Sequence, residues 1–399
     1  MKTFKEFLEL EESEYGHPYL DFLVSPIYPE ELYETTIPIK SAEQAGSNAG
    51  RRVKAAFDAI GEGKNPHTGE PLPKFGSKEH KEIMKGVHER LKKNHGVNGK
   101  SLLAGNLKMG ETKEGSGHTI KDKEGKEIFM QGMSGAPAHS CGGINTCPKA
   151  STECKASCLG KTSGAMARVP ATMEAKKRKT EALIKSPEDT ALALHHHIQH
   201  EQHIADKGHK GGKPYSYVVR MNTTTDHPQK WYEGLRKANP KTQFHDYTKE
   251  PKQVLHNLDH KGEEGQRNLH LTFSSTGVHH PESNWEDARK ILRKGGNVAM
   301  VSRAKNAIKG KEEKEHNKLP KVVHDTETGE KWPTLDGDGR SKDMPGHGDA
   351  RHLDKPGHIA MLHLKGVTAE KAGNFAVPHD HDRVAHVSTS KHKLHDENK

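Results

Sequence analysis

The sequence contains few apolar residues and very few aromatic ones. Hydrophobic residues make up 31% and aromatic residues 5% of the 399 residues, whereas charged residues make up 29%. No stretch approaches the roughly 18 consecutive apolar residues that a membrane-spanning helix requires. The first residues also lack the apolar segment of a secretory signal. We therefore expect a soluble protein without a membrane partner, part of which is poorly ordered.

Cysteine is scarce and confined to one place. The stretch "CGGINTCPKASTECKASC" at 141–158 contains all of it, with the spacing C-x5-C-x6-C-x3-C. Thiolates are soft ligands for zinc or for iron–sulfur clusters, and the Gly- and Ser-containing segment lets several of them converge. Because the chain has no secretory signal and no other cysteine, a metal site is preferred over disulfides and over idle thiols. The expected ligands are Cys141, Cys147, Cys154 and Cys158.

The number of thiolates on the metal decides what such a site can do. Four cysteines on one centre would close it and make it structural or electron-transferring. Three cysteines would leave an open position for substrate or cofactor chemistry. The spacing leaves this number open.

The charge balance gives a weaker indication. Lys and Arg number 63 against 54 Asp and Glu, so the net charge is +9 with all 31 histidines neutral. This charge favours acidic partners such as DNA only weakly. His196, His200 and His203 share one face of an expected helix, either as a metal grip or as a solvated surface. With so many histidines in the chain, the solvated surface is preferred.

From residue 215 onward, short apolar runs alternate with helical segments. Strands are expected at 215–221, 242–248, 268–275, 297–303 and 358–366. A strand–helix step of this kind is typical of parallel βα units. The sequence therefore predicts an α/β fold with a mostly parallel sheet, either covered on both faces or curved into an incomplete (β/α) barrel.

The remaining segments complete the expected domain organisation. Residues 13–130 carry weak helices and are expected to form a helical, partly disordered extension, and a long helical region from 162 to 207 is punctuated by Pro170 and Pro187. Residues 131–377 hold the cysteine segment and the α/β domain. Residues 378–399 have no apolar period and are expected to be a disordered tail.

Polar residues end the expected strands, where parallel α/β folds bind their ligands. Arg220 and Asp226 follow the first strand, and Tyr247 and Lys249 follow the second. We take these four residues as candidates for substrate contact. Polar side chains also occur at such positions simply because loops are solvated.

Three stretches resemble, in the same order, the phage gene product 88 family. They are "TCPKASTECKASC", "YSYVVRMNTTTDHPQKWYEGLRKANPKTQFHDYTK" and "DGDGRSKDMPGHGDARHLDKPGHIAMLHLKG", and the likeness covers about residues 140–375. The resemblance implies that Cys147, Cys154 and Cys158 correspond to three recurrent cysteines of the family, with Cys141 as an addition or a fourth ligand. It also implies an active-site or domain-closing role for the last block, which adds Asp349 and Arg351 to the substrate-contact candidates. That block does not match a calcium-binding EF-hand loop, because position 347 is His where the loop needs Glu.

Two further resemblances concern the cofactor and the first residues. A cysteine segment before a βα array is similar to the plan of radical S-adenosylmethionine enzymes, in which three cysteines hold a [4Fe–4S] cluster at the mouth of a partial barrel. The spacing here departs from their usual C-x3-C-x2-C, so it does not support S-adenosylmethionine binding. Residues 1–12 resemble the capsid-targeting peptide of internal head proteins in large tailed phages, with a cleavage signal at Leu10, Glu11 and Glu12. A short helix that docks on the protein's own surface is the alternative.

Two functional hypotheses follow from these patterns. The first is a phage-encoded protein that holds an iron–sulfur cluster or zinc through its cysteines. In one version of this hypothesis the protein is a radical-type enzyme. The second is a non-catalytic protein of the capsid interior, or one associated with DNA, whose metal site is structural. The corresponding locations are the host cytoplasm and the phage virion.

Overall fold

The computed structural model describes residues 42–105, 120–142, 144–162, 169–208, 212–277, 283–305, 318–339 and 343–388. The expected capsid-targeting peptide at 1–12 lies outside these residues. Within them, every helix is too short or too polar to cross a membrane.

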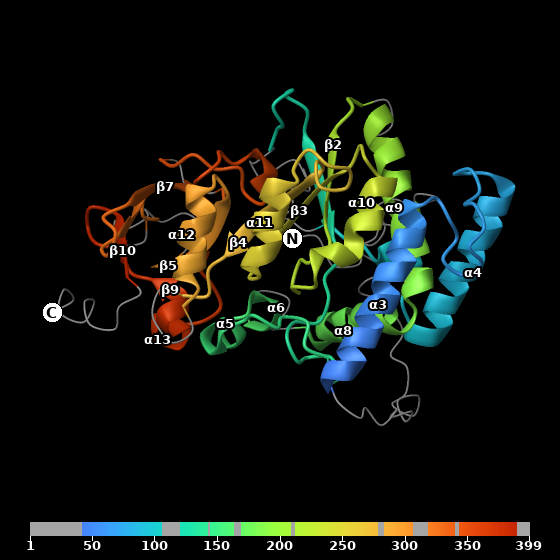
Figure 1. Cartoon of the computed structure of the whole chain (residues 1–399), viewed down its shortest axis with the longest axis horizontal. Coiled ribbons are helices and arrows are strands. Elements are labelled where there is room, and N and C mark those ends of the chain that lie inside the picture. Colours follow the sequence, from blue (N-terminus) through green and yellow to red (C-terminus); the bar gives the residue numbers. More distant parts are fainter. Residues whose placement is uncertain are drawn as a thin grey trace, which may run out of the picture.

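Four long helices form one side of the molecule (Figure 1). They are α3 (Ala42–Gly61), α4 (Lys78–His95), α8 (Pro170–Lys185) and α9 (Pro187–Lys207), and η2 (Gly99–Ser101) follows α4. Ser77 caps the start of α4 by accepting a hydrogen bond from the His80 backbone N–H, and Gly96 ends it in the left-handed conformation. Pro170 and Pro187 each stand at the first turn of a helix, where the missing N–H costs no helical hydrogen bond.

The centre of the molecule is a sheet whose first five strands follow one another in space as they do in the chain. They are β1 (Ile128–Gly132), β2 (Ser216–Arg220), β3 (Gln243–Thr248), β4 (Leu269–Ser274) and β5 (Asn297–Lys305), and each pairs in parallel with the next. The sheet continues through β8 (Ile359–Leu364), β7 (Lys331–Asp336), β6 (Val322–Asp325) and β10 (Val384–Val387). The strands β6 and β7 pair antiparallel, and the short β9 (Ala376–Val377) pairs with β5. The sheet does not close, because β1 and β10 stand at opposite ends of this order.

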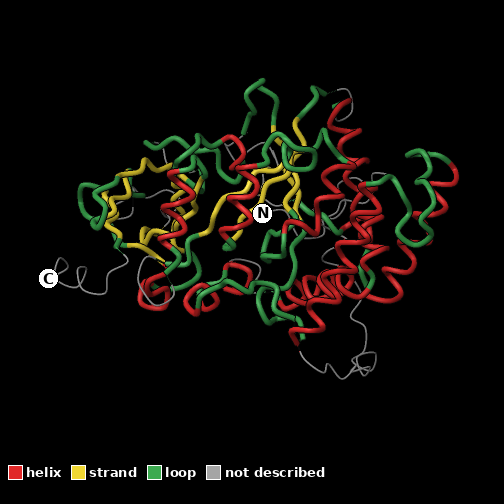
Figure 2. The backbone as a smooth tube through the Cα atoms, in the orientation of Figure 1, coloured by secondary structure: helices red, strands yellow, loops and turns green. Residues whose placement is uncertain are grey.

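The connecting helices cover one face of this sheet. They are η4 (Gln229–Tyr232), α10 (Glu233–Ala238), α11 (Pro251–Asp259) and α12 (Trp285–Arg293), with α13 (Ala369–Ala372) and η7 (Gly373–Phe375) near the end of the chain. Figure 2 shows α10, α11 and α12 in a layer in front of the central strands. Sequential parallel strands with their helices on one face are the winding of a (β/α) barrel. The predicted α/β fold with a mostly parallel sheet and a helical N-terminal part is confirmed.

The main apolar core lies between the sheet and these helices. Strand residues such as Val219, Phe244 and Phe273 are buried there against Leu235 and Ile291 of the covering helices. Alternate residues of each strand face this core, as the period of two in a strand requires. The opposite face of the same strands is therefore lined by the residues between them.

Two segments differ from the sequence-based expectation. Strand β1 begins at Ile128, inside the segment assigned to the N-terminal extension, and pairs with β2 along its length. Strand β10 lies within 378–399, so the expectation of a disordered tail does not hold for Val384–Val387, which pairs with β6. Strands this short carry no readable apolar period, and partner strands elsewhere in the chain supply the hydrogen bonds that stabilise them.

Candidate functional site

The cysteine segment lies along the edge of the sheet where the parallel strands end. It leaves β1 at Gly132 and forms two short helices, α5 (Thr152–Ala156) and α6 (Leu159–Thr162), which Figure 1 shows below the sheet. The Asp226 backbone N–H donates to the Thr146 carbonyl at 2.8 Å, next to the end of β2. The Ser151 hydroxyl donates to the Thr276 carbonyl at 3.2 Å, next to the end of β4. These contacts attach the segment to the ligand-binding edge of a parallel sheet.

Three of the four thiols are electrostatically coupled to the same lysine. We call Cys147, Cys154, Cys158, Asp226 and Lys249 the rim site. The ammonium of Lys249 interacts with all three cysteines and with the Asp226 carboxylate, and it hydrogen-bonds Cys154. The three thiols and Lys249 are each only partly buried. The rim site is thus a set of partly buried soft ligands within electrostatic range of one cation.

The pKa shifts at the rim site reflect competition between burial and charge. Burial raises the pKa of Cys147 and Cys154, while the Lys249 ammonium opposes the rise. Burial lowers the pKa of Lys249, but the charges of Cys154 and Asp226 outweigh it and keep that pKa above its usual value. Burial also raises the pKa of Asp226, against the effect of Lys249, whose backbone N–H donates to Asp226 Oδ2 at 2.9 Å. Cys147 and Cys154 are therefore mainly protonated at neutral pH unless a metal ion replaces the proton.

Cys141 lies apart from the other three thiols. It is 2% exposed, and its Sγ lies 3.8 Å from the Lys177 carbonyl of α8. Burial raises its pKa to about 11. All four cysteines are free, and the described residues include no group of three or more His, Cys, Asp or Glu already arranged to hold a metal ion. The expected four-cysteine ligand set is therefore not assembled in this structure.

Strand β3 connects the rim site with the face of the sheet away from the helices. Phe244 joins the helix-side core, so His245 and Tyr247, the residues of opposite phase, face the other way. In the same phase, Lys249 follows just beyond the strand end. A line of polar side chains thus runs along this face up to the rim site.

Four of the six substrate-contact candidates meet on this face. The Arg220 guanidinium carbon lies 5.0 Å from the centre of the Tyr247 ring, and Arg220 Nη1 lies 3.7 Å from Asp349 Oδ1. Arg351, in η6 (Arg351–Leu353), pairs with Asp354 at 3.0 Å and influences the pKa of Tyr247. The segment before β8 therefore brings the closing motif onto β2 and β3. The other two candidates, Asp226 and Lys249, belong to the rim site.

This face carries hydrogen-bonding groups without partners among the described residues. We name it the inner-face cluster: Arg220, His245, Tyr247, His270, Thr272, Asp349 and Arg351. Both ring nitrogens of His245, the Thr272 hydroxyl and the Nε atoms of Arg220 and Arg351 are buried without a hydrogen bond. Buried polar groups in proteins are nearly always paired. The unpaired donors and acceptors of this cluster can therefore bind water or a polar ligand.

The sequence-based candidates did not include three members of this cluster. His245, His270 and Thr272 lie on the inner face of β3 and β4, and burial lowers the pKa of His270 to about 3 and that of His245 well below its usual value. Both imidazoles are therefore neutral. The signal was present in "TQFHDYT" and "NLHLTFSS", where these residues alternate with core-facing apolar ones.

The comparisons with known proteins give one family. The family model described as "Gene product 88" matches residues 102–375, which is more than half of the chain. The matched span contains the whole rim site and the whole inner-face cluster, and it begins after the end of α4. No curated protein and no solved structure matches the chain.

Proposed function

This chain belongs to the phage gene product 88 family, and we propose that Cys147, Cys154 and Cys158 hold an iron–sulfur cluster at the mouth of its open (β/α) barrel. The observation that carries the proposal is the position of three soft ligands around Lys249, at the edge of the sheet where such folds carry out chemistry. The fourth cysteine, Cys141, is buried elsewhere.

The arrangement supports an open centre over a closed structural zinc. A closed zinc site needs four ligands, whereas a cluster held by three thiolates keeps one iron free for another ligand. Three thiolates bring negative charge, and the ammonium of Lys249 is placed to offset it. The ligands need not be assembled beforehand, because binding a metal removes the protons that Cys147 and Cys154 otherwise hold.

The inner-face cluster supplies the binding groups for a substrate. A three-thiolate iron–sulfur cluster supplies single electrons and a free coordination position. Arg220 and Arg351 can bind an anionic or carbonyl oxygen of a substrate, and Asp349 can accept from a donor group. Tyr247 lies on β3 next to Arg220 and would contact a substrate that these groups bind. The proposed activity is radical-type chemistry on a small polar substrate.

Purification without oxygen tests the metal part of this proposal. We expect a brown protein with a broad visible absorption band that bleaches on reduction, and with stoichiometric iron and acid-labile sulfide. The Cys154→Ser variant should lose the band, whereas the matched Cys141→Ser variant should keep it. A colourless protein with stoichiometric zinc would contradict the iron–sulfur cluster and show a zinc site instead. A protein that takes up neither metal would contradict the proposal.

An activity assay on the reduced protein then distinguishes a catalytic metal site from a purely structural one. S-adenosylmethionine is the co-substrate to add, although the C-x6-C-x3-C spacing differs from that of the enzymes that use it. Its reductive cleavage by the wild type, and not by Arg220→Gln protein with a full cluster, would support the radical-type activity. Absence of cleavage in the wild type would contradict the part of the proposal that involves this co-substrate.

A second candidate function is that of a protein of the capsid interior that contacts DNA. It is favoured by the net charge of +9 and by the resemblance of residues 1–12 to a capsid-targeting peptide. Mass spectrometry of purified particles should find the chain cut near Glu12, and DNA binding should weaken steeply with salt. An intact N-terminus in the particles, or absence of the protein from them, would contradict the packaging.

A further inference from the structure

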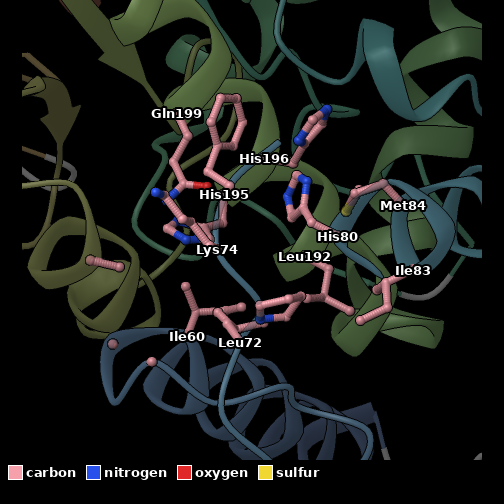
Figure 3. Close-up of a pocket in the computed structure, with 15 residues that line it drawn as sticks. Ile60, Leu72, Lys74, His80, Ile83, Met84, Leu192, His195, His196 and Gln199 are labelled. Atoms are coloured by element: carbon pink, nitrogen blue, oxygen red, sulfur yellow. The ribbon is translucent and has the colours of Figure 1, made fainter. Parts of the chain in front are cut away.

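A second pocket lies on the helical side of the molecule, away from both parts of the candidate site. It has a volume of about 320 Å³ and is formed by α3, the segment that follows it, α4, α9 and α10 (Figure 3). This volume is within the roughly 300–1,000 Å³ of small-molecule sites. Two of its walls, α3 and α4, precede residue 102, so the N-terminal helices build this pocket onto the family domain.

The N-terminal helices pack closely enough to make this pocket a fixed feature. The start of α10 approaches the C-terminal part of α3 so tightly that a Cβ on Gly234 would collide with the Phe57 carbonyl. The Phe57 and Tyr232 rings meet edge to face, 5.4 Å apart, and both are fully buried. Arg90 of α4 is held to Asp189 of α9 by an ion pair of 2.6 Å. The pocket is therefore preformed.

One part of the pocket is apolar and the other is lined by imidazoles. Figure 3 places Ile60, Leu72 and Leu192 on one side and His80, His195 and His196 on the other. Burial lowers the pKa of all three histidines, to about 4 for His195 and about 3 for His196. At neutral pH the imidazoles are uncharged, so the part of the pocket that they line favours an uncharged group over a charged one. Lys74 also lines the pocket and adds a basic side chain to it.

The hydrogen bonds of these rings determine which ring nitrogen carries the proton. The Asn239 amide nitrogen donates to His195 Nδ1 at 3.1 Å and also donates to the Leu235 carbonyl, which fixes the orientation of the amide. The Gly76 backbone N–H donates to His80 Nδ1 at 3.3 Å. In both neutral rings the proton is consequently on Nε2, so each ring presents an N–H donor. His196 Nδ1 is buried and has no partner among the described residues.

The pocket also has an aromatic wall. The ring of Phe75 lies 5.2 Å from that of His80 and 5.7 Å from that of His196, and the two imidazoles lie 4.9 Å apart, with the three rings tilted by 37–60° to one another. A further aromatic ring can pack against such tilted rings edge to face or in an offset stack. From this wall and the neutral N–H donors, we propose that the pocket binds an uncharged heteroaromatic molecule of nucleobase size. This site does not involve the cysteines and does not depend on the metal.

Fluorescence titration with 2-aminopurine, an uncharged fluorescent heteroaromatic, tests this site on the full chain. We expect saturable quenching with the wild type, because the base stacks on the aromatic wall. Ile83→Trp, which fills the pocket, should weaken binding by roughly tenfold or more. The matched variant Ile184→Trp changes a partly buried isoleucine outside the pocket and should bind as the wild type does.

A second variant and a second probe keep the test decisive. If Ile83→Trp does not fold, His196→Phe takes its place, since its Nδ1 has no partner to lose, and it should also bind more weakly. Indole, which has no ring acceptor, should bind more weakly than 2-aminopurine. Equal or tighter binding of indole would contradict recognition through hydrogen bonds. No saturable quenching by the wild type, or binding unchanged by the pocket variants, would overturn the proposal.

Discussion

The two faces of the central sheet are built from alternate residues of the same strands, yet they differ in chemistry. On the helix side, Phe244 and Phe273 pack in a continuous apolar core. On the inner face, His245 and Thr272 are fully buried but have hydrogen-bonding atoms without partners. Packing of the first kind stabilises a fold, whereas burial of unpaired polar groups opposes it. The helix-side face therefore contributes stability, whereas the unpaired polar groups of the inner face reduce it.

Neighbouring residues of β4 test this difference most strongly. Phe273 is fully buried in the helix-side core, so Phe273→Ala should lower the free energy of unfolding by about 3–5 kcal/mol. Thr272, equally buried on the inner face, has an unpaired hydroxyl, and Thr272→Val should be neutral or stabilise by about 1 kcal/mol. Denaturant unfolding monitored by circular dichroism measures both values. A large loss for Thr272→Val would show that the inner face is an ordinary core.

Acid unfolding tests the helical side through its buried histidines. Burial, together with His200, Lys179 and His88, lowers the pKa of His197 to about 3, and its Nε2 lies 2.9 Å from Gln131 Oε1. Because the pKa in the folded state is below that in the unfolded chain, the stabilising contribution is present above about pH 6.5 and is lost as the pH falls through the folded value.

We expect His197 to contribute a slope of at most about 1.4 kcal/mol per pH unit below pH 6.5. The variant His197→Gln should show a shallower loss of stability between about pH 6 and 4 than the wild type. Urea unfolding at a series of pH values is the measurement. A slope that is the same in both proteins would mean that His197 is already solvated in the folded state.

The fold was more accessible from the sequence than the site. Strands β2 to β5 carry apolar runs with clear ends, and Pro170 and Pro187 mark helix starts, so these elements were predicted close to their observed bounds. Strands β1 and β10 were not, because they lie outside the regular strand–helix alternation and pair with strands distant in the chain.

The complete site could be recognised only from the three-dimensional structure. Arg220, Tyr247 and Asp349 come together through the strand order and the closing motif. Strand-end reasoning selected Arg220 and Tyr247, and the family resemblance selected Asp349. The separation of Cys141 from the other thiols depends on contacts such as that between Thr146 and Asp226, which no spacing reveals. His245 was missed because only the polar residues at the strand ends were considered as candidates.

Thiol alkylation tests the rim site without any metal. The Lys249 ammonium lowers the pKa of Cys154 against the effect of burial, so Lys249→Met should raise that pKa further. A rise of one unit would slow alkylation of Cys154 by about tenfold near pH 8, because the thiolate is the reactive form. Lys252→Met removes an exposed lysine in the first turn of α11, so it is the control and should leave the rate unchanged. Mass spectrometry after timed iodoacetamide treatment gives the rate for each cysteine, and equal rates in all three proteins would contradict the convergence on Lys249.

The smallest change in stability and in thiol reactivity is expected on substitution of Cys141. Its thiol is 2% exposed and its pKa is about 11, so it should be the slowest of the four cysteines to react. Cys141→Ala removes one buried sulfur atom and should lower the free energy of unfolding by only about 1 kcal/mol. Because Cys141 faces α8 and the other thiols face Lys249, alkylation of Cys147, Cys154 and Cys158 should proceed at wild-type rates in this variant. Altered rates at those three cysteines would show that Cys141 shares their site after all, and would restore a four-thiol centre.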